Sequence, residues 1–162
     1  MTIGSVITAM IEYLRGDVHQ VEHLLTVYGY AKAIGEEEGL DANTQRTLEI
    51  AAVVHDIGIP LAEQKYGSHA GPYQEETGPG EARALLEKLG CDAPTIDRVC
   101  NLVGRHHTYE NVDGLDCRIL LEADYLVNAN FHRHGEAAVK AARESFFRTK
   151  AGIRYLENLY LK

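Results

Sequence analysis

Histidine and aspartate side chains occur in this sequence where the neighbouring residues are strongly apolar. His55 and Asp56 directly follow the apolar run at residues 50–54. Burying an imidazole and a carboxylate there costs free energy unless hydrogen bonds or an ion satisfy them. A divalent metal ion binds neutral imidazole and ionised carboxylate together, so the pair indicates a metal site. The alternative is a core histidine hydrogen-bonded to the backbone, with Asp56 as a turn residue.

Two further residues are candidates for the same site. Asp124 lies in the apolar segment ILLEADYLV, where a carboxylate needs a cation or several hydrogen-bond donors. Glu122 in that segment is expected to be solvated or paired at the rim. His23 shares a helical face with Val27 and Ile34, which turns it toward the core. One such histidine is more often a satisfied core residue, but several helices that each direct a His or Asp inward favour a metal site.

A histidine doublet follows another apolar run. His106 and His107 come after VCNLVG, where a predicted helix ends. Imidazoles at a helix end suit metal ligation, although paired surface histidines are common. Arg105 beside them is a candidate for contact with an anionic substrate, the alternative being an ordinary surface charge.

The elements that must position these residues are predicted to be helices, because no segment sustains the alternation of a strand. Asp17 is expected to cap one helix, and Asp41 or Asn43 the next. Frequent Gly and Pro predict an irregular segment over residues 61–79. The expected helices cover residues 5–14, 17–38, 41–58, 80–89, 93–107, 118–130, 136–147 and 149–161.

These elements predict an all-α fold and one domain over residues 1–162. The 162 residues suffice to bury a core, and we expect a helical bundle of roughly seven or eight helices. Its motif-bearing part is expected at residues 18–130, with the C-terminal helices at residues 135–161 packed on it. These terminal helices either form a homodimer interface or simply cover the core.

Composition restricts the class of partner. The net charge of −8 argues against a nucleic-acid polymer, whereas a bound metal ion still allows a small phosphorylated substrate. Cys91, Cys100 and Cys117 have no paired spacing, which predicts free thiols. The N-terminal segment has no basic region or cleavage site, and no apolar run is long enough for a membrane span. We therefore expect a cytoplasmic location and no membrane partner.

The ordered set His23, His55-Asp56 and Asp124 resembles the H…HD…D signature of the HD superfamily of metal-dependent phosphohydrolases. The resemblance covers about residues 21–128 and agrees with the all-α prediction. It implies that these four residues ligate a divalent ion such as Mn, Fe, Ni, Co, Mg or Zn. The implied reaction is hydrolysis of a phosphoester of a small molecule, nucleotides included, by a metal-activated water.

Members with two metal ions add histidines between the HD pair and the last aspartate. His106 and His107 resemble these additions, and Asp56 would then bridge the two ions. The family's further histidine, just before the helix expected at residue 80, is absent. Glu75 or Glu76 stands at about that place. We expect Glu75 to replace the histidine, the alternative being a solvated acidic loop before a helix.

The resemblance also leaves room for cationic side chains beside the substrate. Lys65 and Arg105 are candidates to neutralise the leaving phosphate. The alternative for both residues is an exposed surface position, which is where Lys and Arg are usually found.

Three other functions are compatible with parts of the sequence. Residues 19–23 match the H-x-x-E-H pattern of inverzincin peptidases, in which His19 and His23 would bind zinc and Glu22 would activate water. That pattern leaves the HD pair and Asp124 unexplained. The second function is that of an HD-fold di-iron oxygenase, and the third is that of a non-catalytic module that binds a metal or a nucleotide.

Overall fold

Nine helices joined by short loops make up most of the chain in the computed structural model, which describes all residues 1–162 and contains no strand. The all-α prediction is confirmed, with one helix more than expected. In chain order the helices are α1 (Ile3–Tyr13), α2 (Val18–Glu37), α3 (Ala42–Val54), α4 (Ile59–Tyr66), α5 (Gly71–Lys88), α6 (Ala93–Val103), α7 (Leu115–Phe131), α8 (Glu136–Ser145) and α9 (Lys150–Tyr160).

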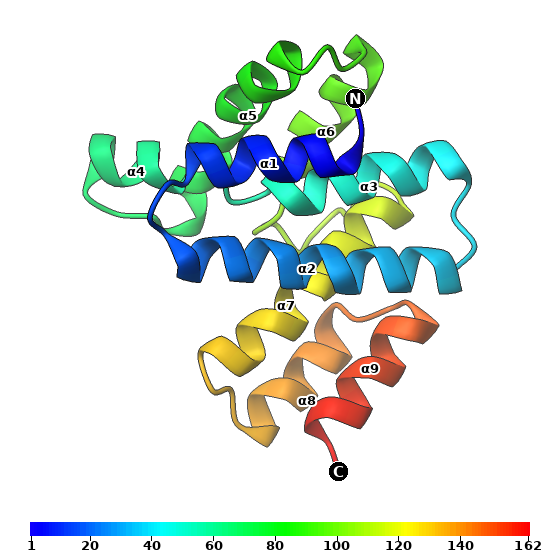
Figure 1. Ribbon diagram of the computed structural model, residues 1–162. Helices are drawn as coiled ribbons and strands as arrows, with labels where there is room; N and C mark the ends of the chain where they lie inside the picture. Colours follow the sequence, from blue (N-terminus) through cyan, green and yellow to red (C-terminus); the bar gives the residue numbers. More distant parts are fainter.

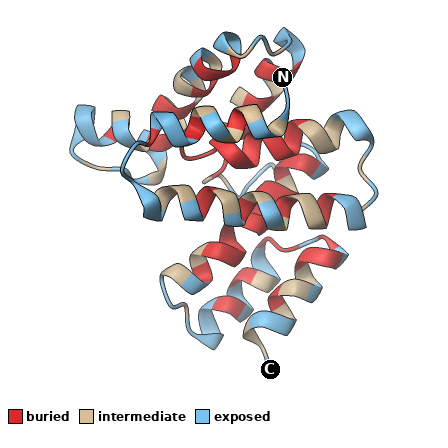
Figure 2. Cartoon of the chain, in the orientation of Figure 1, coloured by how far each residue is buried: buried red, intermediate tan, exposed pale blue.

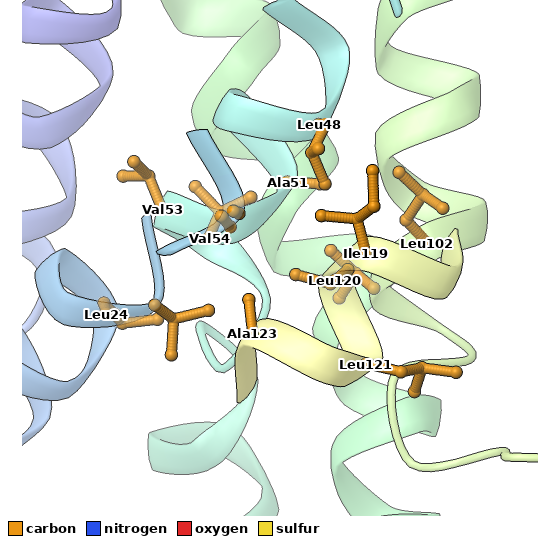
Figure 3. Packing of buried hydrophobic residues seen from close by; sticks show 14 of the residues in the cluster. Leu24, Leu48, Ala51, Val53, Val54, Leu102, Ile119, Leu120, Leu121 and Ala123 are labelled. Atoms are coloured by element: carbon orange, nitrogen blue, oxygen red, sulfur yellow. The ribbon is translucent and has the colours of Figure 1, made fainter. Parts of the chain in front are cut away.

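Helix α3 forms the centre of the fold, and α1, α2, α6 and α7 pack around it (Figure 1). Every residue of α3 from position 47 to its end is buried, as is every residue of α7 from 119 to 127, whereas the outer helices keep an exposed side (Figure 2). Side chains of α3, α6 and α7 point toward one another in the core, among them Ala51, Leu102 and Ile119 (Figure 3). Each fully buried Leu or Ile of this kind contributes about 2 kcal/mol to stability.

The helix starts follow the capping residues in the sequence. The side chain of Asp17 accepts a hydrogen bond from the backbone N–H of Gln20, and that of Asp41 accepts from the N–H of Thr44. Both predicted caps are therefore confirmed. Helix α3 ends at Val54, so His55 and Asp56 lie in the turn that leads to α4. This turn brings polar side chains to the end of a deeply buried helix.

The prediction of an irregular segment over residues 61–79 is wrong, because α4 and α5 occupy most of it. Pro60 and Pro72 stand in the first turn of their helices, where a missing N–H breaks no hydrogen bond. Gly78 lies where α5 meets α6: a Cβ atom there would come within 2.7 Å of a methyl carbon of Val103. Glycine at this position permits close packing of two helices and does not mark a break in α5.

The last two helices pack beside α7 at the C-terminal end of the molecule (Figure 1). Glu122 of α7, predicted to be solvated or paired at the rim, is buried in the interior with an exposed fraction of 0%. Its carboxylate accepts hydrogen bonds from the backbone N–H groups of Arg148 and Thr149, directly before α9. The prediction failed because these donors are distant in sequence, and burial of a carboxylate requires such partners.

The structure also bears on the predictions about cysteine pairing and about membrane-spanning segments. The cysteines Cys91, Cys100 and Cys117 are unpaired thiols, as their spacing indicates. No helix combines the length and the apolar composition that crossing a membrane requires.

Candidate metal centre

The structure brings four predicted ligands together from α2, α7 and the turn after α3. We call His23, His55, Asp56 and Asp124 the first cluster. The Nε2 atom of His23 lies 3.1 Å from Oδ1 of Asp124 and 3.2 Å from Oδ2 of Asp56. The Nε2 atom of His55 lies 3.3 Å from the same Asp124 oxygen and 3.3 Å from Nε2 of His23. All four side chains are buried.

The hydrogen bonds around His55 show what this cluster can hold. Its Nδ1 atom lies 2.8 Å from the carbonyl oxygen of Ala52, so Nδ1 carries the proton that the carbonyl accepts. The lone pair of Nε2 then faces a carboxylate oxygen of Asp124, which is also an acceptor. Only a proton or a cation between them makes this contact favourable. Two imidazole nitrogens and two carboxylate oxygens therefore fit a divalent transition-metal ion.

The charges in the first cluster support the same conclusion. Burial by itself lowers the pKa of His23, but hydrogen bonds to Asp124 and Asp56 outweigh it and raise that pKa to about 10. Burial by itself raises the pKa of Asp56, but the neighbouring imidazoles hold it well below its usual range. Both carboxylates are thus ionised at neutral pH, and an imidazole proton occupies the place that a cation can take.

Two amide side chains orient the carboxylates of the first cluster. The Nε2 atom of Gln20 donates a hydrogen bond to Oδ2 of Asp56, at 2.9 Å. The Nδ2 atom of Asn128 donates to Oδ2 of Asp124, at 3.0 Å. Such outer contacts fix the directions in which ligand atoms point. No motif in the sequence marks Gln20 for this role.

A second cluster adjoins the first on the other side of Asp56. It consists of Asp56, Gln74, His106 and His107. Oδ1 of Asp56 lies 3.0 Å from Nε2 of His106, and Oε1 of Gln74 lies 3.3 Å and 3.1 Å from the Nε2 atoms of His106 and His107. Burial and the neighbouring His106 lower the pKa of His107 to about 4, so that imidazole is neutral at pH 7.

Glu75, predicted as a ligand, does not face this cluster. Its Oε1 atom accepts hydrogen bonds from the backbone N–H of His107, at 3.0 Å, and from the hydroxyl of Thr108, at 2.8 Å. Glu76 accepts a hydrogen bond from the Tyr66 hydroxyl. Because α5 begins at Gly71, earlier than predicted, consecutive side chains here point about 100° apart. Gln74, which the sequence analysis missed, is the one that faces the histidines.

The two predicted cationic residues do not line the cavity onto which His23, Asp56 and Asp124 of the first cluster open. This cavity has a volume of about 380 Å³, and no Lys or Arg lines it. Lys65 is exposed on α4, outside the cavity. Arg105 donates a hydrogen bond to the carbonyl oxygen of Asn111, at 3.1 Å. Neither candidate for the leaving phosphate therefore lines the cavity.

The peptidase pattern at residues 19–23 does not form a site. The ring of His19 packs on Phe131, with 4.9 Å between ring centroids, and the groups of side chains close enough to hold a metal ion do not include His19. Glu22 is exposed on the outer side of α2 and does not line the cavity. The structure gives His23 carboxylate partners that the peptidase pattern does not include.

Comparisons with known proteins agree with this geometry. A protein-family model for the HD domain matches residues 21–129, which contain all residues of both clusters. The crystal structure of a predicted HD superfamily hydrolase from an uncultured Thermotogales bacterium superposes with a TM-score of 0.69 at 24% sequence identity. The alignment covers 94% of this chain and 82% of that one, and it shows a shared fold. No curated protein matches the chain.

Proposed function

The chain belongs to the HD-domain family, and we propose that it is a metal-dependent phosphohydrolase that cleaves a phosphoester of a small molecule. The first cluster carries the proposal, because the Nε2 atoms of both of its histidines lie 3.1–3.6 Å from an oxygen of each of its two carboxylates, beside an open cavity. The description of the Thermotogales protein as a predicted hydrolase supports the same class of reaction.

In this proposal the residues of the first cluster hold a divalent ion, while their neighbours keep them oriented. An ion bound in this way lowers the pKa of a coordinated water molecule and stabilises negative charge on phosphoryl oxygens. Asp56 and Asp124 supply the negative charge that retains the ion. Gln20 and Asn128 hold these carboxylates in position, and burial strengthens every charge interaction because bulk water is excluded.

Metal content is the first test of the proposal. We expect the untagged wild-type protein, loaded with Mn²⁺, Fe²⁺, Ni²⁺ or Zn²⁺, to retain about one ion or more per chain. Asp124→Asn keeps the shape of the side chain but removes the charge, and it should lose this ion. Asp97→Asn, at an exposed position on α6, is the matched control and should retain it. A wild-type protein that takes up none of these metals contradicts the proposal.

Phosphate release is the second test, with a panel of small phosphomonoesters and phosphodiesters. The expected result is turnover by the loaded wild-type protein and by Asp97→Asn, with loss of turnover in Asp124→Asn. Parallel reactions without oxygen distinguish the hydrolase from a di-iron oxygenase, because hydrolysis needs no oxygen. Metal binding without turnover of any compound would instead identify a binding module.

A further inference from the structure

Gln74 is a buried polar residue that faces the cavity without belonging to the first cluster. Its exposed fraction is 6%. The amide nitrogen donates a hydrogen bond to the carbonyl oxygen of His69, at 2.6 Å, which identifies the nitrogen and the oxygen of the amide. The oxygen Oε1 is therefore held facing the Nε2 atoms of His106 and His107, at 3.3 Å and 3.1 Å.

Around Nε2 of His106, several hydrogen-bond acceptor atoms lie close together. Nδ1 of His106 lies 2.7 Å from the carbonyl oxygen of Val103 and donates its proton there. The lone pair of Nε2 then faces Oε1 of Gln74 and, at 3.0 Å, Oδ1 of Asp56. Three acceptor atoms that converge in a buried place are unfavourable unless a positive charge lies among them. A divalent cation satisfies all three acceptors at once.

We infer that the amide oxygen of Gln74 is a ligand for a second divalent ion, together with Asp56, His106 and His107. The inference rests on the proposed function, because Asp56 is shared: Oδ2 faces the first cluster and Oδ1 faces the second. The sequence predicts the carboxylate of Glu75 as the ligand at this place. In the structure the neutral amide of Gln74, one residue earlier, faces the histidines instead.

The neutral amide determines how tightly the second ion binds. The first cluster contains two carboxylates, whereas the second contains only the shared Asp56. Because affinity for a cation decreases when fewer of its ligands are charged, the second ion binds more weakly and its site is the last to be filled. The number of ions per chain therefore follows the free concentration of the metal.

Titration of the metal-free protein with Mn²⁺, followed by calorimetry, tests this inference without any substrate. The wild-type protein should show two classes of site. In Gln74→Leu the weaker class should lose about ten-fold or more in affinity while the tighter class is unchanged. Gln74→Glu keeps an oxygen ligand and adds charge, so its weaker class should bind at least as tightly as in the wild type. Gln64→Leu, at an exposed position on α4, is the matched control and should behave as the wild type does.

Several outcomes would overturn the inference. One is a weaker class with the same affinity in Gln74→Leu as in the wild type. Another is a wild-type protein that binds Mn²⁺ in a single class of one ion per chain. If Gln74→Leu fails to fold when tested by circular dichroism, Gln74→Glu decides, and a weaker class that binds Mn²⁺ less tightly than in the wild type contradicts the role of Gln74. Loss of the tighter class, or absence of phosphate release, would count against the proposed function instead.

Discussion

At the scale of single residues, Asp56 is the side chain on which both clusters depend. One of its oxygens faces His23 and the other faces His106, and Gln20 holds the carboxylate between them. The surrounding imidazoles keep its pKa well below the usual range, so its charge is present throughout the neutral pH range. Variation of pH in that range therefore leaves the charge of Asp56 unchanged.

Competition between protons and metal gives a prediction for His23. Its pKa of about 10 in the metal-free protein means that it holds a proton below that pH, and a bound ion must displace this proton. The apparent affinity of the first ion should therefore rise about ten-fold per pH unit between roughly pH 6.5 and 8.5. The rise should end as the pH approaches the pKa. Mn²⁺ titrations at several pH values measure the slope, and an affinity that does not change with pH would contradict the assigned charges.

The sequence identified most residues of the candidate site, but not all of them. His23, His55, Asp56 and Asp124 could be predicted because each is a polar residue in an apolar helical pattern. Gln74 could not, because the choice between it and Glu75 depends on the residue at which α5 begins. A shift of one residue rotates the side chains by about 100°, and local sequence does not determine a helix start that closely.

At the scale of the elements, the position of α5 depends on glycine residues at its contact with the turn after α3. A Cβ atom on Gly58 would lie 2.5 Å from the backbone nitrogen of Gly78, and one on Gly78 would lie 2.7 Å from Val103. Helix α5 therefore lies close enough to α6 and to the HD turn for Gln74 to reach the histidines. In sequence, the same glycines resemble helix breaks, which is why α4 and the first half of α5 were not predicted.

A pair of alanine substitutions in α5 tests this packing. Gly78→Ala should lower the free energy of unfolding by about 1–3 kcal/mol, because the added methyl group overlaps Val103. Gly80→Ala, at a position in the same helix with open space around it, should raise that free energy by up to about 1 kcal/mol. Urea denaturation of the metal-free proteins measures both changes. Equal effects at the two positions would show that close packing is not the reason for Gly78.

At the scale of the whole molecule, charge is distributed unevenly with respect to the cavity. The chain carries a net charge of −8, and no Lys or Arg lines the cavity with the first cluster. Bound cations would thus be the main positive charge available to a substrate inside it. Each further phosphate group on a substrate would add negative charge that no side chain of the cavity neutralises.

This distribution predicts a preference among nucleotides if the proposed function holds. A nucleoside monophosphate should be hydrolysed with a kcat/KM at least about ten-fold higher than that of the triphosphate of the same nucleoside. Steady-state assays with the two compounds at equal ionic strength measure the ratio. Higher salt should reduce the difference, because screening weakens the repulsion of the additional phosphates. A preference for the triphosphate would indicate a cationic residue that reaches the cavity from outside its present lining.

The order of the ligands along the chain has a consequence for biosynthesis. The ligands of the first cluster begin at His23 and end at Asp124, 101 residues later (124 − 23). During translation, α2 and the HD turn leave the ribosome well before α7 does, so a nascent chain lacks the last carboxylate until most of it has been made. If the first cluster holds an ion as proposed, that ion is acquired late, because an unfinished chain has no complete site in which to bind a metal.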